Sequence, residues 1–374
     1  MEKVSAVKHI AKRRGEVKKS IVVILTALVG VLILTFFVLR IVYPGILRAG
    51  NRISQPGIDL MEMVEIGGIS QALYFRGQDV SNPVILYLHG GPGGPMLPFL
   101  HTFQYDWEHD FTVVQWDQRN AGKTFYANDP EAVRYTMSGQ RVLEDAYEVT
   151  LYIKQKLNKD KIIIMGHSWG SVLGTMLVQT YPEAFCAYIG VGQVSNMTDN
   201  ERIGYEKVLE AAKAAENKKD ISAIEELAPW PPLIYDDSLK NQVLKLRGYQ
   251  AKYGLAAGVN FRVILDIITS PYYSSKDIMY FTKDMLYYQG EVMRFLSVEY
   301  DIRDYGLTFE IPVFFIMGEQ DYQTPYPVAK DLLEEISAPV KMFFSIPNAG
   351  HNTMTDNRVE FNRVLLEEIK SLIG

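Results

Sequence analysis

Runs of apolar residues mark out the chain, and the longest lies near its beginning. From Ile21 to Leu39, nineteen residues pass without a charge, enough for a helix of about 28 Å that matches the hydrocarbon core of a bilayer. A cleavable secretory signal has a shorter apolar stretch that ends at small residues, whereas this run continues into RIVYPGILRAG. We therefore predict a transmembrane anchor over residues 20–40 that is retained, with a basic tail at residues 1–19.

The charges of the tail predict the orientation of the anchor. Residues 1–19 contain seven Lys or Arg and two Glu, and positive flanks of membrane helices stay in the cytoplasm. The amino terminus is expected inside, with the rest of the chain extracytoplasmic, in a single-pass protein of a bacterial cell membrane. The polar RAGNRISQPG sequence, rich in turn residues, predicts a spacer over residues 41–57.

Beyond the anchor the chain is acidic. Of 38 Lys and Arg and 44 Asp and Glu, residues 1–40 hold 8 and 2, which leaves 30 against 42 and a net charge of −12. Such a domain is a poor candidate for nucleic-acid binding. Cys186 is the only cysteine, so no internal disulfide can form. With few histidines and no His-Glu-x-x-His motif, we expect no metal and no cofactor.

Shorter apolar runs bounded by turn residues predict buried strands. They cover residues 84–90, 111–117, 162–168, 187–193, 311–321 and 340–351. Continuous apolar strands are typical of parallel sheets that helices cover on both faces. Residues 138–157 have helical spacing after a Ser start signal. The predicted fold is therefore α/β, a doubly wound and mostly parallel sheet.

The pattern changes between residues 195 and 305. This segment is helical and charged at first and then aromatic-rich, without an evident strand. We predict a helical cap over 195–305, inserted between two parts of a core at 58–194 and 306–374. The aromatic residues of the cap, Tyr287 among them, either line a substrate pocket or pack the cap against the core.

The sequence Gly166-His167-Ser168-Trp169-Gly170 follows one apolar run and precedes a helical one. A serine on a tight strand-to-helix turn is held above the sheet, where its hydroxyl can attack a carbonyl. A plain glycine turn is the alternative. We predict Ser168 as a nucleophile, with His167 directed elsewhere.

A serine nucleophile needs a base, and the base needs an orienting carboxylate. Among six histidines, His351 stands at the end of the last apolar run, in a loop just past the strand itself. Asp321 ends the preceding strand, with Glu319 as the reserve. The order Ser168, Asp321, His351 is the one expected of an α/β hydrolase. Backbone donors for an oxyanion are predicted at Trp169 and at Gly91 or Gly90.

Three motifs carry a family resemblance. HGGPGG (89–94), WDQRNAGKT (116–124) and GHSWGS (166–171) occur in this order and resemble the prolyl iminopeptidase branch of the α/β hydrolases. The resemblance covers roughly residues 60–194 and 306–374. It implies a metal-free serine peptidase that releases an amino-terminal residue, often proline, from peptides. Asn120 and His167 stand where that branch commonly has Gly.

The resemblance also implies that acidic residues of the cap read the free amino terminus of the substrate. The candidates in this cap are Glu201, Glu206, Glu210, Glu291 and Glu299, and solvated helix faces are the plain alternative. We predict substrate contacts from Glu206, Glu291 and Tyr287.

The predicted function is that of a membrane-anchored serine hydrolase with aminopeptidase-like activity on short peptides. An esterase or amidase for a small ester or amide is the alternative within hydrolases. A surface binding protein without catalysis is the alternative from another class.

Overall fold

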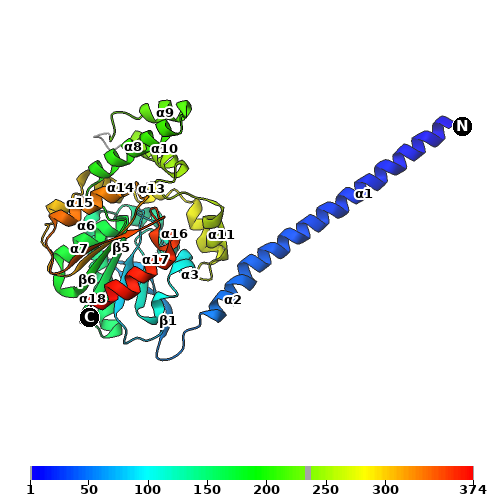
Figure 1. The fold of residues 1–374 in the computed structure, drawn as a ribbon. Coiled ribbons are helices and arrows are strands. Elements are labelled where there is room, and N and C mark those ends of the chain that lie inside the picture. The colour runs from blue at the N-terminus through cyan, green and yellow to red at the C-terminus, as the bar shows by residue number, and fades with distance from the viewer. Residues whose placement is uncertain (1, 232–236, 374) are drawn as a thin grey trace.

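The computed structural model of the chain describes residues 2–231 and 237–373. Its centre is an eight-stranded sheet in the order β1-β2-β4-β3-β5-β6-β7-β8 (Figure 1). The strands are β1 Ile58–Ile66, β2 Ile69–Gly77, β3 Val84–Leu88, β4 Thr112–Asp117, β5 Ile162–His167, β6 Phe185–Val191, β7 Val313–Gly318 and β8 Lys341–Ile346. The pairs β1/β2 and β2/β4 are antiparallel, and the others are parallel. This confirms the predicted α/β class and mostly parallel sheet.

Both faces of the parallel strands are buried, which explains their continuous apolar sequences. On β5, Ile162 and Ile164 pack on one face with α6 (Gly139–Leu157), α7 (Trp169–Thr180) and α15 (Tyr326–Glu335). Ile163 and Met165 pack on the other face, with α3 (Leu100–Phe103) and α17 (Arg358–Arg363). The remaining helices around the sheet are α4 Gly122–Ala127, α5 Pro130–Arg134, α16 Thr353–Asp356 and α18 Lys370–Ile373.

The hairpin β1–β2 was not predicted. Strand β1 mixes exposed and half-buried residues at the sheet edge, so it lacks the continuous apolar run of the inner strands. The signal present was the Gly67-Gly68 turn, in which both glycines have positive φ, as tight hairpins require.

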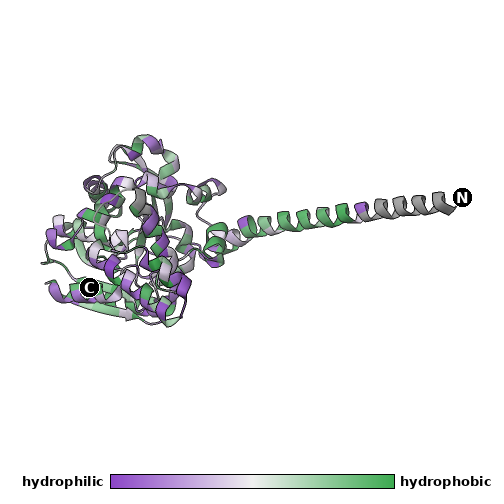
Figure 2. Ribbon diagram, turned by 90° about the horizontal axis from the view of Figure 1, so that it is seen from above, coloured by the Kyte–Doolittle hydropathy of each residue, from purple (hydrophilic) through white to green (hydrophobic). Residues whose placement is uncertain are grey.

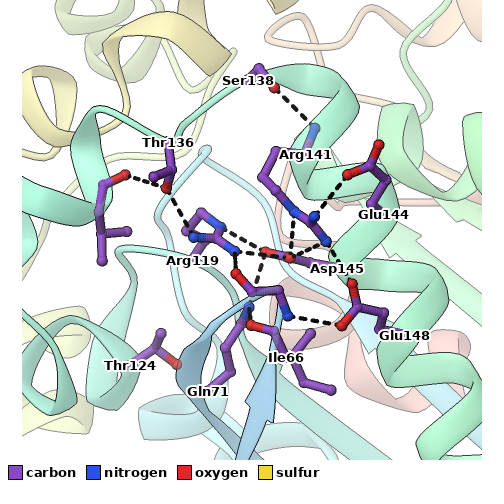
Figure 3. A network of polar contacts seen from close by, with 12 residues as sticks. Ile66, Gln71, Arg119, Thr124, Thr136, Ser138, Arg141, Glu144, Asp145 and Glu148 are labelled. Carbon is purple, nitrogen blue, oxygen red and sulfur yellow. Dashed lines mark hydrogen bonds and ion pairs between the residues drawn. The ribbon is translucent and has the colours of Figure 1, made fainter.

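A buried ion pair ties this hairpin to α6 (Figure 3). Arg119 and Asp145 have side chains 1% and 0% exposed, and Arg119 Nε donates to Asp145 Oδ2 over 2.7 Å. Asp145 also accepts from Gln71 on β2 and from Arg141 on α6. Arg119 Nη2 donates to the carbonyl of Gly67 at the hairpin turn. Arg119 thus braces the structure behind the motif WDQRNAGKT.

The segment between β6 and β7 is helical. It comprises α8 Met197–Ala214, α9 Lys218–Glu225, α10 Asp237–Lys252, α11 Phe261–Thr269, α12 Ser275–Ile278, α13 Met285–Tyr288 and α14 Gly290–Arg294. These helices lie at the end of the sheet where the parallel strands finish, and we call them the cap (Figure 1).

A long helix precedes the domain. Helix α1 (Glu2–Phe37) continues through the π-helical turn η1 (Val38–Val42) into α2 (Tyr43–Gly50), so the predicted spacer is helical as far as Gly50. Figure 2 shows an apolar stretch leaving the domain. Among the described residues one helix, Lys18–Gly50, is long and apolar enough to cross a membrane, a property that anchors and signal sequences share. The side chains of residues 1–17, most of the basic tail, lie outside the described residues.

Candidate active site

Ser168 occupies the turn between β5 and α7. Its backbone has φ 55° and ψ −121°, a conformation that L-residues rarely adopt and that functional sites often maintain. The Ser168 amide donates to Val191 O at the end of β6 over 2.9 Å. A Cβ on Gly166 or Gly170 would overlap backbone atoms of Gly170 or Leu88. The flanking glycines are therefore what allows this turn to close.

Asp321 and His351 lie together beyond β7 and β8. His351 Nδ1 is 2.9 Å from Asp321 Oδ2. Thr324 donates to both carboxylate oxygens, from its amide over 2.9 Å and from its hydroxyl over 2.8 Å. Burial alone would raise the pKa of Asp321, but the interactions with His351 and Thr324 lower it below the ordinary value. The ionised carboxylate accepts the Nδ1 proton of His351, so Nε2 is the ring nitrogen that can accept a further proton.

His167 connects the serine turn to the loop of His351. Its Nε2 is 2.9 Å from His351 O, and the two rings are 4.8 Å apart at their centroids. Burial and the neighbouring His351 lower the pKa of His167 to about 3, so a neutral ring donates this hydrogen bond. Gly192 lies against the His351 ring, because a Cβ at this position would be only 3.2 Å from His351 Cε1.

Within the described residues no hydrogen bond joins the Ser168 hydroxyl directly to His351. The two are placed at one edge of the sheet by the contacts of His167 and Gly192. In free enzymes, catalytic hydrogen bonds are often long or poorly aligned, and they shorten when substrate binds.

Trp169 and Gly91, the two predicted oxyanion donors, line the same cavity as Ser168. Trp169 is the first residue of α7, so its N–H has no partner within the helix. Gly90 O accepts from Gly94 N over 3.0 Å and lies 2.9 Å from His89 Nδ1. Because C=O and N–H point in opposite directions across a trans peptide, these contacts turn the Gly91 N–H away from His89.

A network of neutral side chains fixes this arrangement. The Gln118 amide donates to His89 Nε2 over 3.2 Å, so Nδ1 must carry the proton that Gly90 O accepts. Burial lowers the pKa of His89 to about 4, which keeps the ring neutral. Gln118 Nε2 donates to His89 O, and Trp169 Nε1 donates to Gln118 Oε1. Sequence reasoning did not assign a role to Gln118 or Thr324, although Gln118 lies within a quoted motif.

Ser168, Trp169 and Gly91 line a cavity of about 530 Å³ beneath the cap. Its walls are mostly apolar side chains of the cap, among them Met197, Val243, Leu244, Met285, Met293 and Leu296.

Among the described residues that line this cavity, Glu201 and Arg247 are the charged ones. They form an ion pair through Glu201 Oε1. Glu201 is 5% exposed, and its Oε2 has no partner among the described residues. The cavity wall therefore contains one buried carboxylate oxygen that no described residue satisfies by a hydrogen bond.

The three predicted substrate contacts lie elsewhere. Glu206 pairs with Arg202 and Glu291 pairs with Arg294 on exposed helix faces. The Tyr287 hydroxyl donates to Glu131 at the surface. None of the three lines the cavity of Ser168. Sequence alone does not separate these acids from Glu201, since all lie in helices of mixed charge.

Asp117 is a second buried carboxyl near the site. Burial raises its pKa to about 6, although the Lys123 amide and the Tyr273 hydroxyl donate to it. Tyr273 belongs to the cap, so this contact joins the cap to β4. Over the described residues, no group of three or more His, Cys, Asp or Glu side chains is placed to hold a metal ion.

The strand order and the serine turn define an α/β hydrolase fold, and comparisons with known proteins agree. A family model described as alpha/beta hydrolase fold matches residues 83–219. A probable aminopeptidase of Bacillus subtilis, YbaC, is 29% identical over 306 residues, 79% of this chain and 91% of the relative. A probable proline iminopeptidase of Leptolyngbya boryana is 27% identical over 121 residues, 32% of this chain and 35% of the relative.

Solved structures share the fold. A proline iminopeptidase-related protein from Thermus thermophilus superimposes with a TM-score of 0.56 at 20% identity, over 84% of this chain and 99% of the other. The chain thus has the α/β hydrolase fold. It resembles the prolyl iminopeptidase-related branch of that fold, and its relatives support a hydrolase.

Proposed function

We propose that the protein is a membrane-anchored serine hydrolase that releases amino-terminal residues from short peptides. The observation that carries the proposal is the Asp321–His351 hydrogen bond of 2.9 Å at the sheet edge where Ser168 lines the cavity. The order of the three residues and the strained serine turn are those of acyl-transfer enzymes of this fold.

In the proposed reaction, Ser168 Oγ attacks the substrate carbonyl while its proton passes to His351 Nε2. The oxygen that becomes negative accepts hydrogen bonds from the amides of Trp169 and Gly91. The C–N bond then breaks, and the leaving amine takes the proton from His351. Water attacks the acyl-enzyme with His351 as base again, which releases the acid and restores Ser168. Asp321 stabilises the imidazolium throughout.

Glu201 is the proposed partner for the free amino group of the substrate. Its Oε2 is buried in the cavity wall without a partner among the described residues, and a substrate ammonium would satisfy it. The apolar walls and the volume of about 530 Å³ leave room for side chains larger than proline, so we expect residues such as leucine to be accepted as well.

A fluorophosphonate probe tests the serine chemistry directly. The full chain in detergent is expected to label, and the variant Ser168→Ala to fold but not label. An unlabelled wild-type protein would favour the alternative of a binding protein without catalysis.

Substrate choice is tested with leucine, alanine and proline amides that have free or acetylated amino termini. Glu201→Gln should lower kcat/KM on free amines about 10- to 100-fold, the loss of one charge-assisted hydrogen bond. Acetylated amides and esters should be unaffected, and Glu206→Gln, an exposed acid on the same helix, is the matched control. Equal rates on free and acetylated substrates would instead favour an esterase or amidase, a reading that the pairing of Glu201 with Arg247 supports.

The membrane anchor is the second part of the proposal. The run from Ile21 to Leu39 is uncharged, and the basic tail favours a cytoplasmic amino terminus. The protein should resist carbonate extraction from membranes, and protease added outside should digest the domain. Release by carbonate would contradict the anchor without bearing on Ser168.

A further inference from the structure

Helix α11 is unusually apolar for its exposure. Its sequence FRVILDIIT has six apolar residues in nine, yet Thr269 is its one buried residue. Phe261 is 78% exposed and Ile264 45%, and Val259 just before the helix is 83% exposed. A contiguous apolar surface of this kind normally marks a site of interaction.

The end of α11 is bonded to the membrane helix. Arg40, the first charge after the apolar run, donates to Ile268 O over 2.5 Å and to Tyr273 O over 3.0 Å. Arg48 of α2 donates to Pro271 O. Carbonyls at the end of a helix need such donors, and here the donors come from the segment that leaves the bilayer. Figure 1 shows α11 on the side of the domain facing α1.

The segment after Arg40 adds to the apolar surface. Ile41, Tyr43 and Ile46 are 58%, 44% and 62% exposed, and α11 packs against η1. Because Ile268 is hydrogen-bonded to Arg40, the two residues lie at the same depth relative to the bilayer. The carboxyl end of α11 therefore lies where the apolar run of the membrane helix ends.

We propose that α11, together with Tyr43 and Ile46, is inserted in the headgroup region of the bilayer that α1 spans. The inference rests on the proposed anchor, because Arg40 is what sets the depth of α11. An interfacial helix buries its apolar face about 5–10 Å into the boundary between headgroups and acyl chains. The domain is then held against the membrane surface at two points.

The insertion has a consequence for the active site. A hollow of about 480 Å³ is lined on one side by Asn260, Val263 and Asp266 of the α11 region and on the other by His351 and Asn352. With α11 in the bilayer surface, this hollow opens beside the headgroups, where amphipathic substrates concentrate.

The test places a polarity-sensitive fluorophore on Ile264→Cys in the full chain, with Cys186→Ala as background. The matched control is Leu151→Cys on α6, because Leu151 is 44% exposed against 45% for Ile264. Figure 1 shows α6 and α11 at opposite sides of the domain. Both proteins are reconstituted in vesicles of phosphatidylcholine and phosphatidylglycerol.

The label at 264 is expected to shift to the blue and to be quenched by lipids that carry a spin label near the carbonyl end of the chain. Quenching by a spin label near the methyl end should be weaker, and the label at 151 should respond to neither. Phe261→Asp, at an exposed position, should reduce the quenching at 264 without changing fluorophosphonate labelling.

An unquenched label at 264 in protein that resists carbonate would overturn the inference and leave the anchor standing. A blue shift that grows with the ratio of protein to lipid, without quenching, would also overturn it, because a second copy would then cover α11. Release by carbonate would remove the anchor and the inference together.

Discussion

Replacing Asp145 by Asn removes one charge from the most buried ion pair of the core. The Asp145 side chain is 0% exposed. It accepts from Arg119 Nε over 2.7 Å and Nη2 over 3.0 Å, from Gln71 over 2.9 Å and from Arg141 over 2.9 Å. Asn has nearly the same shape, so the substitution leaves the volume unchanged. It leaves the guanidinium of Arg119, 1% exposed, without a counter-charge.

The expected cost follows from that burial. Removing one partner of a buried ion pair costs about 3–5 kcal/mol, because the remaining charge stays out of water. Arg141 does not share this cost, since it keeps Glu144 and Glu148 as partners at the surface. At about 2–4 °C per kcal/mol for a domain of this size, Asp145→Asn should lower Tm by about 6–20 °C.

The assay is thermal unfolding of the full chain in detergent, followed by tryptophan fluorescence. Glu148→Gln is the matched control. Glu148 is on the same helix and also bonds Arg141, but its side chain is 45% exposed. Exposed pairs contribute at most about 1 kcal/mol. If the two variants had equal Tm values, burial would not determine the loss of stability, and the reasoning would be refuted.

Three further predictions concern the edge of the sheet. Burial raises the pKa of Asp117 from 3.8 to about 6, so its protonated form stabilises the fold below pH 4 and this stabilisation is lost as the pH rises through 6. Relative to Asp117→Asn, the wild type should lose about 3 kcal/mol of unfolding free energy over that range. The measurement is the difference in Tm between the two proteins as a function of pH. Gly170→Ala should abolish fluorophosphonate labelling, because the added Cβ would overlap a carbonyl of β3. Gly248→Ala on α10, where the added Cβ meets open space, should instead raise the free energy of unfolding by about 0.5–1 kcal/mol. Thr324→Val removes one of the hydrogen-bond donors that lower the pKa of Asp321. The value of kcat should then fall about tenfold with KM unchanged, and the acid limb of the pH profile of kcat should move to higher pH.

The parallel core was predictable because each inner strand is buried on both faces. Residues such as Ile162 and Ile163, which face opposite sides, are both apolar, and this makes a run that the sequence displays directly. Strand β1 is covered on one face only and sits at the edge, so its pattern resembles that of a loop. The hairpin turn Gly67-Gly68 was its clearest signal.

The residues of the candidate site also divide into those that the sequence indicates locally and those that it does not. The positions of Ser168, Asp321 and His351 follow from local rules, namely a serine between glycines and polar residues just past strand ends. Which cap acid reaches the cavity depends on how helices far apart in the sequence pack. Glu201 and Glu206 lie on one helix, yet the first is 5% exposed and the second pairs with Arg202 at the surface. No local pattern distinguishes them.

The three motifs that carry the family resemblance are joined by hydrogen bonds. These bonds give a structural reason for residues of the motifs that take no part in the proposed reaction. His89 follows β3, Gln118 follows β4 and Trp169 follows β5, and the hydrogen bonds from Trp169 Nε1 to Gln118 and between Gln118 and His89 join them. The network ends at Gly90 O and so determines where the Gly91 amide points. Stabilising an oxyanion requires donors that are already oriented before charge develops. Burial lowers the pKa of His89 to about 4, so its ring stays neutral near pH 7. The orientation it imposes would therefore not change while His351 takes up and releases a proton in the proposed reaction.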